Sequence, residues 1–341
     1  MKINFEKYNF QKEVPLNISS GEISGVENII LSLEDNEFLG MGEICSIIYI
    51  SKDEMTLSLE ILNDFANQFP LNGSIAETHK KAREFGVPGF ALSALNNAQW
   101  DLLSKRCKIP LYKMLGLSQP VISTSVTLGI TQKKDVGNQI KRLLKKSNIL
   151  KVKLGSPQGI EFDKEMFLQV MQELKGTDVK VRVDANGGWS VDDALIMLKW
   201  LAEKGVEFVE QPLPVGLERE LPRLSKNRPL PIFIDESCNN AEDLLQLRNC
   251  VDGVNIKLAK CGGISGALEL ITTAGLLKLK TMLGCMCESS LGIASAAALG
   301  SLVDYLDLDS HLNIANDPFA GLGFDNGKIY LNEIPGAGVV R

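Results

Sequence analysis

The hydrophobic pattern of this chain changes character near residue 120. Beyond that point, short apolar runs typical of β-strands alternate with amphipathic stretches typical of helices. One such stretch, residues 190–205, has apolar side chains at helical spacing, with Ser190 placed as an N-cap and Gly205 as a stop signal. Eight strands in this rhythm predict a (β/α) barrel. The rival, an open doubly wound sheet, usually has fewer parallel strands and a Gly-rich phosphate turn, which this sequence lacks. In chain order the predicted strands read ISTSVTLGI, ILKVKLG, VKVRVDAN, VEFVEQP, PIFIDES, GVNIKL, KTMLGC and YLDLDS.

The part of the chain before residue 120 predicts a smaller α+β domain. Residues 26–34 and 38–45 look like antiparallel strands, and residues 50–69 and 89–107 have helical patterns. The Gly-rich tail beyond Asn316 has strand character and no helical pattern. The predicted fold class is therefore α/β, with a TIM-like barrel next to an α+β domain.

Composition excludes several classes of function. A net charge of −6 and a pI near 5.3 argue against a surface for nucleic acid or anionic membrane. The longest apolar run, residues 293–303, is too short to span a bilayer, and the first ten residues lack the apolar core of a signal peptide. The 7 cysteines form no CxxC pair, so we expect reduced thiols in a cytoplasmic protein. With only 2 histidines present, acid–base chemistry is expected to use carboxylates or lysines.

Acidic residues end three consecutive predicted strands. Asp184, Glu210 and Asp235 are spaced by 26 and 25 residues, close to one βα unit, so they should occupy equivalent positions and converge. Carboxylates at about 4 Å repel one another by about 4 kcal/mol a pair in a partly buried site, unless a divalent cation lies between them. Oxygen ligands without His or Cys favour Mg²⁺ or Mn²⁺ over zinc. The alternative for each residue alone is a helix N-cap.

Lysines on two of the predicted strands are expected to face one place. Lys151 and Lys153 are two apart, and strand side chains alternate, so both point to the same side of the second strand. Lys257 ends the sixth strand, which lies opposite the second in a ring of eight. A metal-bound ligand would then have an ammonium group on each side. A lysine near a cation and another lysine has its charged form disfavoured, which suits a base. The alternative is an exposed edge strand with solvated lysines.

These motifs together resemble the enolase superfamily, in its muconate-lactonizing-enzyme subgroup. KVKLG is similar to the KxK motif of that subgroup, and NIKLAKCGG is similar to the segment with its second catalytic lysine. VDANGGW, VEQP and DES are similar to its metal-ligand strands. Residues 101–116, interpreted as one helix, resemble a recurrent part of the capping domain. The resemblance implies a (β/α)₇β barrel over residues 119–312, covered by a capping domain made of residues 1–118 and the tail 313–341.

The resemblance also implies a shared chemistry, the removal of a proton next to a carboxylate. The resulting enediolate carries negative charge that the cation and a lysine stabilise. If a second lysine returns a proton from the opposite face, the carbon inverts. The residues implied are Asp184, Glu210 and Asp235 as Mg²⁺ ligands, Lys153 and Lys257 as the acid/base pair, Lys151 beside the substrate carboxylate, and Lys260 as the competitor of Lys257.

The last predicted strand distinguishes between the reactions of the subgroup. Asp307 and Asp309 are two apart and resemble the DxD signature of dipeptide epimerases. A carboxylate pair suits a free α-ammonium, which a dipeptide has and which N-acylated amino acids and succinylbenzoate precursors lack. We therefore expect an isomerase that inverts the α-carbon of the C-terminal residue of a dipeptide. An o-succinylbenzoate synthase, an N-acylamino acid racemase and a non-catalytic binding protein on the same barrel are the alternatives.

Specificity is predicted from the N-terminal part of the capping domain. In family members that act on Ala-Glu, an arginine in a flexible loop pairs with the substrate side chain. The corresponding stretch here, residues 14–31, has no Arg or Lys, and Gly21 holds that position. A buried carboxylate without a partner is costly, so we expect a preference for small or hydrophobic dipeptides of the Ala-Ala or Ala-Val type. An L-Ala-D/L-Glu epimerase is an alternative, as is a cationic-dipeptide epimerase that uses Glu22.

Several further residues are expected near the substrate. Cys285, Met286 and Cys287 of the GCMCES segment are candidates for contact with the substrate, and core packing of this cluster is the alternative. A homo-oligomer is one alternative for the assembly, and no oligomeric state is predicted. The expected set is Thr127, Cys285 and Cys287 against the substrate, Asn186 and Glu236 behind the metal ligands, and Glu288 near the mouth without a defined role.

Overall fold

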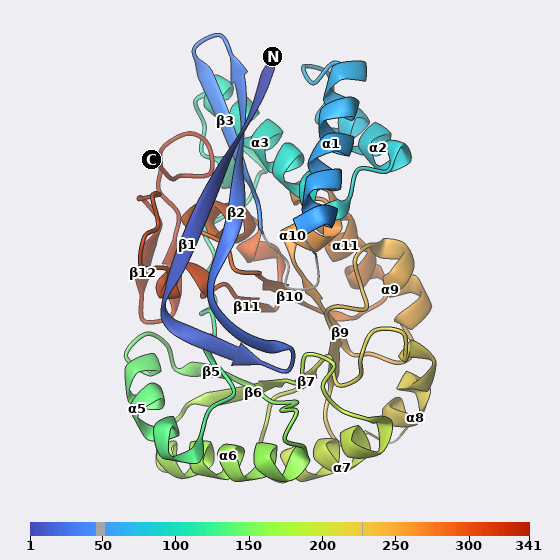
Figure 1. Ribbon diagram of the computed structural model, residues 1–341, viewed down its shortest axis with the longest axis vertical. Coiled ribbons are helices and arrows are strands. Elements are labelled where there is room, and N and C mark those ends of the chain that lie inside the picture. The colour runs from blue at the N-terminus through green and yellow to red at the C-terminus, as the bar shows by residue number, and fades with distance from the viewer. Residues whose placement is uncertain (46–51, 227) are drawn as a thin grey trace.

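The computed structural model describes residues 1–45, 52–226 and 228–341. The barrel predicted from the alternating pattern is present (Figure 1). Eight parallel strands are ordered as in the chain, and a bridge between Thr124 and Leu306 joins the two ends of the sheet into a ring. The strands are β4 (Val126–Leu128), β5 (Ile149–Lys153), β6 (Lys180–Asp184), β7 (Val209–Glu210), β8 (Ile232–Ile234), β9 (Gly253–Ile256), β10 (Lys280–Gly284) and β11 (Tyr305–Asp307).

Helices connect successive barrel strands, as the (β/α)₇β prediction requires. In α7 (Val191–Ala202), Ala194, Leu198 and Leu201 are buried, and the Ser190 side chain accepts a hydrogen bond from the Asp193 amide, as expected of an N-cap. The other helical elements of the barrel are α5 (Lys133–Leu143), α6 (Ile160–Glu173), η1 (Glu218–Glu220), α8 (Leu221–Ser225), α9 (Ala241–Leu247), α10 (Leu258–Cys261), α11 (Ile264–Leu276), α12 (Ser290–Ala297), η2 (Gly300–Leu302) and η3 (Ser310–Asn313).

The N-terminal part forms a separate antiparallel sheet with helices packed on it. The strand order is β1-β2-β3, and a Cβ at Gly42 would lie 2.0 Å from the Ala94 carbonyl oxygen, so only glycine lets β3 approach α3 this closely. Buried side chains of the sheet and helices form one apolar core. The elements are β1 (Lys2–Ile18), β2 (Gly21–Asp35), β3 (Phe38–Ile44), α1 (Lys52–Gln68), α2 (Ile75–Phe85), α3 (Gly89–Cys107) and α4 (Leu111–Met114).

The C-terminal tail contacts the N-terminal helices and the barrel. It contains the short strands β12 (Gly323–Asp325) and β13 (Lys328–Tyr330), and residues 314–341 contain no helix. The Ala337 amide donates to Asp101 on α3, whereas the Thr124 amide at the barrel donates to the Gly327 carbonyl. The domain boundaries at residues 118/119 and 312/313 stay a prediction. No helix in the described ranges is long and apolar enough to cross a membrane.

Two local predictions were wrong. Residues 101–116 are not one helix, because α3 ends at Cys107, Lys108 adopts a left-handed conformation (φ 57°) and Pro110 disfavours helical backbone at the residue before it. Gly21 and Glu22, expected to lie in a specificity loop, are instead part of a long hairpin: β1 and β2 pair up to Ile18 and Gly21, with a two-residue turn between them. In Figure 1 this hairpin runs from the N-terminal sheet across the barrel.

Candidate active site

Three buried carboxylates meet where consecutive barrel strands end. Asp184 ends β6, Glu210 ends β7 as its register partner, and Asp235 follows β8. Each is fully buried, and one oxygen from each lies within 4.8 Å of the other two. The regular spacing in the sequence therefore corresponds to a real convergence. This all-oxygen donor set fits a hard divalent cation such as Mg²⁺ or Mn²⁺.

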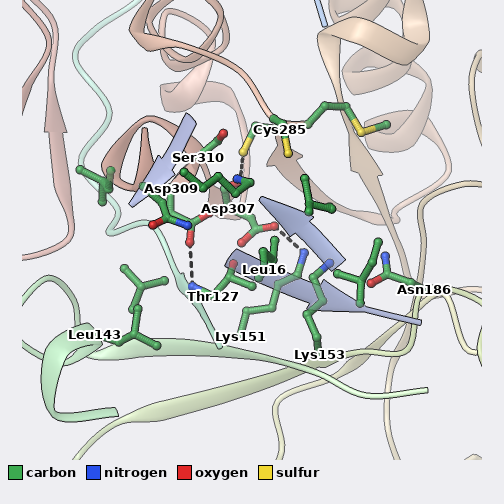
Figure 2. A pocket seen from close by; sticks show the side chains of 18 of the residues that line it. Leu16, Thr127, Leu143, Lys151, Lys153, Asn186, Cys285, Asp307, Asp309 and Ser310 are labelled. Atoms are coloured by element: carbon green, nitrogen blue, oxygen red, sulfur yellow. Dashed lines mark hydrogen bonds and ion pairs between the residues drawn. The ribbon is translucent and has the colours of Figure 1, made fainter. Parts of the chain in front are cut away.

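Two lysines of β5 reach into this carboxylate cluster. The Nζ atom of Lys151 lies 3.1 Å from Asp184, 3.1 Å from Glu210 and 2.5 Å from Asp307. The Nζ atom of Lys153 lies 2.6 Å from Asp184. Figure 2 shows the two side chains pointing the same way. The alternation of strand side chains thus places both lysines inside the barrel mouth, and the exposed-edge alternative is wrong.

Lys257, after β9, and Lys260, on α10, both pair with Asp235, and their surroundings separate their roles. Each Nζ atom lies 2.6 Å from an Asp235 oxygen. Lys260 also donates to the backbone carbonyls of Asp235 and Cys238, and it does not line the cavity described below. Lys257 lines that cavity, with its Nζ atom 3.9 Å from the Met286 sulfur. Of the two competing lysines, only Lys257 is thus placed to meet a ligand.

The electrostatics of the cluster follow from burial and mutual pairing. Burial alone would lower the pKa of Lys151 and of Lys257, but the neighbouring carboxylates outweigh it and hold both pKa values well above the usual range. Burial raises the pKa of Asp184, but Lys153 and Lys151 lower it to about 2. The pKa of Glu210 is raised to about 8, mainly by burial and next by the neighbouring Asp184 carboxylate.

These ion pairs favour the charged form of Lys151 and Lys257, whereas the sequence-based expectation of a disfavoured charged form concerned a site that holds a divalent cation. The physical reason is that each lysine shares its carboxylates with the site expected for a metal ion. A divalent cation on the three carboxylates would compete for the same oxygens and weaken these ion pairs.

A single cavity joins the barrel mouth to the N-terminal hairpin (Figure 2). Lys153 and Lys257 both line it, from β5 and from the end of β9. These strands are four apart in a ring of eight, so the two amines approach from opposite walls. The other predicted residues that line the cavity are Thr127, Lys151, Asn186, Glu236, Cys285, Met286, Cys287, Asp307 and Asp309.

The two carboxylates of the DxD segment have different partners. Asp307 accepts from the Ser125 hydroxyl at 2.6 Å and pairs with Lys151, so although burial raises its pKa, the lysine lowers it overall. One oxygen of Asp309 accepts from the Thr127 amide at 2.7 Å, while burial and Asp307 raise the Asp309 pKa. Among the described residues, Asp309 is therefore the carboxylate of this pair without a lysine ion pair, and it is available to a cationic ligand.

Residues beside the carboxylate cluster hold its members in place. The Asn186 backbone amide donates to Asp184 at 2.8 Å, and the Asn186 side chain donates to Glu236 at 3.0 Å.

Glu288 does not line the cavity but is buried near Glu43. Burial is the main cause that raises the pKa of Glu288 to about 7, and the Glu43 carboxylate is the second. The Cys285 thiol donates to the Asp307 carbonyl oxygen, and burial raises its pKa well above the usual range.

The sequence did not identify several residues that line the cavity, among them those of the N-terminal hairpin. Gly21 and Glu22 are exposed and do not line it, whereas Ile18 and Ile23 on either side of them do. The alternation of Leu16 and Ile18 is a strand signal that could have identified this face of the hairpin. The complete set of missed lining residues is Lys12, Leu16, Ile18, Ile23, Val126, Arg142, Leu143, Lys146, Ser310, Leu312 and Asn313.

Comparison with known proteins defines the family. Residues 135–340 match the family model described as "Enolase C-terminal domain-like". The chain is 44% identical over 341 residues to a hydrophobic dipeptide epimerase of Roseobacter litoralis, covering 100% of this chain and 99% of the relative. It is 43% identical over 344 residues to a hydrophobic dipeptide epimerase of Flavobacteria bacterium (strain MS024-2A), covering 99% and 97%. The chain thus belongs to the enolase superfamily, and within it to the family of dipeptide epimerases.

A solved structure supports the same assignment. The dipeptide epimerase of Enterococcus faecalis, in complex with Mg and the dipeptide L-Leu-L-Tyr, matches with a TM-score of 0.90 at 28% sequence identity. The match covers 100% of this chain and 99% of that structure. The likeness therefore extends over the N-terminal sheet and the tail as well as the barrel.

Proposed function

We propose that this protein is a Mg²⁺-dependent dipeptide epimerase, an isomerase that inverts the α-carbon of the C-terminal residue. The observation that carries the proposal is the placement of Lys153 and Lys257 on opposite walls of one cavity. Inversion needs one group that takes the α-proton and a second that delivers a proton to the other face. Two amines on the same wall could exchange the proton but could not invert the carbon.

The proposed metal ligands are Asp184, Glu210 and Asp235, whose convergence supports this role. When bound, Mg²⁺ or Mn²⁺ supplies positive charge beside the substrate carboxylate, where negative charge grows as the α-proton leaves. Lys151 adds a second positive charge at the same place because it lies between Asp184, Glu210 and Asp307. Asn186 orients Asp184 by donating to one of its oxygens.

The substrate's orientation follows from the charges at the two ends of the cavity. The C-terminal carboxylate belongs at the cluster of Lys151 and the proposed metal ligands, which leaves the α-ammonium for Asp309. The hairpin residues Ile18 and Ile23 line the cavity where the hairpin tip meets Asn186. Their apolar surface supports the predicted preference for small or hydrophobic C-terminal residues, as in Ala-Ala and Ala-Val, and the names of the two relatives agree with it.

Solvent deuterium exchange tests the function directly. Incubation of L-Ala-L-Val with the protein and Mg²⁺ in D₂O should place deuterium at the α-carbon of valine and produce L-Ala-D-Val. L-Ala-L-Ala should react likewise, and L-Ala-L-Glu should react more slowly. The absence of α-exchange across a broad dipeptide library would overturn the proposal.

The cytoplasmic location of the enzyme and the boundaries of its domains are also part of the proposal. The described cysteines, Cys45, Cys107, Cys238, Cys250, Cys261, Cys285 and Cys287, are all free thiols, which supports a reducing cytoplasmic compartment. The division into a barrel over residues 119–312 and a cap made of 1–118 and 313–341 is supported by the hydrogen bond between the tail and α3.

A further inference from the structure

One end of the cavity carries three basic residues that the proposed reaction does not use. Lys12 lies on β1, Arg142 on the last turn of α5, and Lys146 shortly after that helix. All three are partly buried and line the cavity. They come from segments far apart in the sequence, so the fold brings them to one place.

The hairpin defines which end of the cavity this is. Its tip lies over the β6 loop, where the Ser19 hydroxyl donates to the Asn186 carbonyl at 3.0 Å. Its stem lies over the segment after η3, where Lys12 forms a backbone bridge with Ile314. Figure 2 shows Leu143, the neighbour of Arg142, on the side of Asp309 and far from Asn186. The three basic residues therefore belong to the end of the cavity near Asp309, where the dipeptide's N-terminal residue is placed.

Lys12, Arg142 and Lys146 have no carboxylate counter-ion among the described residues. In the part of the chain that the structure describes, Lys151, Lys153 and Lys257 each pair with a carboxylate, whereas no carboxylate pairs with Lys12 or Arg142. Lys146 likewise has no carboxylate partner among the described residues, although it donates to the Leu312 carbonyl at 2.7 Å. A dipeptide with a neutral N-terminal side chain brings one ammonium group and one carboxylate, both already placed. One more negative charge would complement this end of the cavity.

We propose that Lys12, Arg142 and Lys146 form a subsite for a carboxylate on the side chain of the substrate's N-terminal residue. The substrate class is then a dipeptide with Glu or Asp first and a small or hydrophobic residue second. This inference rests on the proposed function, because it uses the orientation in which Asp309 holds the α-ammonium. A guanidinium group can bind a carboxylate through two parallel hydrogen bonds, so Arg142 is the main determinant.

An isosteric pair of substrates isolates the charge. L-Glu-L-Leu and L-Gln-L-Leu differ in shape very little, so the ratio of their kcat/KM values reports the added carboxylate. At low ionic strength we expect a ratio of at least about ten in favour of L-Glu-L-Leu, of the order of one charge-assisted hydrogen bond. The ratio should fall as salt rises, because the three basic residues are only partly buried.

Variants with matched controls assign the effect to these residues. Arg142→Met should bring the ratio close to one, and Lys12→Met should lower it, whereas Lys141→Met, an exposed neighbour outside the cavity, should leave it unchanged. Two results would overturn the subsite, provided that L-Ala-L-Leu is still epimerised. The first is a kcat/KM ratio near one in the wild type, and the second is a ratio that neither Arg142→Met nor Lys12→Met changes. Failure of L-Ala-L-Leu to exchange overturns the proposed function instead.

Discussion

Individual charged side chains in the barrel mouth have neighbours of opposite charge at ion-pair distance. Lys151 has three carboxylate neighbours, and Asp235 has two lysine neighbours. Removing one partner of a buried charge set leaves the other uncompensated, which typically costs about 3–5 kcal/mol of stability. Substitutions here therefore change the amount of folded protein as well as the chemistry. Ratios between substrates and between epimers are the readouts that separate the two effects.

Glu288 gives a prediction for stability against pH. Its folded pKa is raised from 4.5 to about 7 by burial and by Glu43, so between these values the folded state binds more protons than the unfolded state. The free energy of unfolding should fall as pH rises through this window, by roughly 3 kcal/mol at most. Glu288→Gln cannot ionise, so its melting temperature minus that of the wild type should increase from pH 5 to pH 8.

Calorimetry or thermal fluorescence at several pH values measures this difference. Glu165→Gln, which removes an exposed carboxylate on α6, is the control and should show no such trend. A difference between Glu288→Gln and wild type that does not change with pH would contradict the assignment.

Among the secondary-structure elements, the β1–β2 hairpin determines the shape of the cavity. It places Leu16, Ile18 and Ile23 against the mouth of the barrel, with Gly21 and Glu22 facing away. Ile18→Ala or Ile23→Ala should lower kcat/KM for L-Ala-L-Leu by about tenfold relative to L-Ala-L-Ala, because each methylene lost from an apolar contact is worth about 0.8 kcal/mol. Glu22→Gln is the matched control. An unchanged ratio in both isoleucine variants would show that the hairpin does not select the substrate.

The sequence predicted those elements whose signal is local or regularly repeated. The βα rhythm and the recurring acidic strand ends were enough to place Asp184, Glu210 and Asp235 together. The position of the hairpin tip over the barrel could not be predicted, because Ser19 and Asn186 are 167 positions apart and no local pattern links them. The raised pKa values of Lys151 and Lys257 could not be predicted either, because they depend on distances to carboxylates on other strands.

At the scale of the whole molecule, hydrogen bonds join the N-terminal sheet to the barrel mouth. Glu43 on β3 is buried and accepts hydrogen bonds from the Ser289 hydroxyl and amide at the start of α12. Asn28 on β2 donates to the Cys287 carbonyl at 2.7 Å. The sheet is therefore attached to the same loop that carries the cavity's cysteines. Movement of the N-terminal part and access to the site are expected to be linked.

Metal binding should stabilise the whole fold. A ligand that binds only the native state at 100 times its dissociation constant adds about 2.7 kcal/mol to the free energy of unfolding. Millimolar Mg²⁺ should therefore raise the melting temperature of the wild type by about 2 °C or more. Glu210→Gln should lose this shift, whereas Asp192→Asn, an exposed acidic control, should keep it. Equal shifts in wild type and Glu210→Gln would refute the carboxylate cluster as the metal site.

The most direct test of the central claim is stereospecific exchange by the two lysine variants. L-Ala-L-Val and L-Ala-D-Val are each incubated in D₂O with Lys153→Met and with Lys257→Met, and α-deuterium is followed by NMR. Because the amines occupy opposite walls, both variants should fail to interconvert the epimers. One variant should exchange only the L-valine epimer, and the other only the D-valine epimer. If either variant epimerises at the wild-type rate, or if both exchange the same epimer, the two-wall arrangement is not the catalytic one.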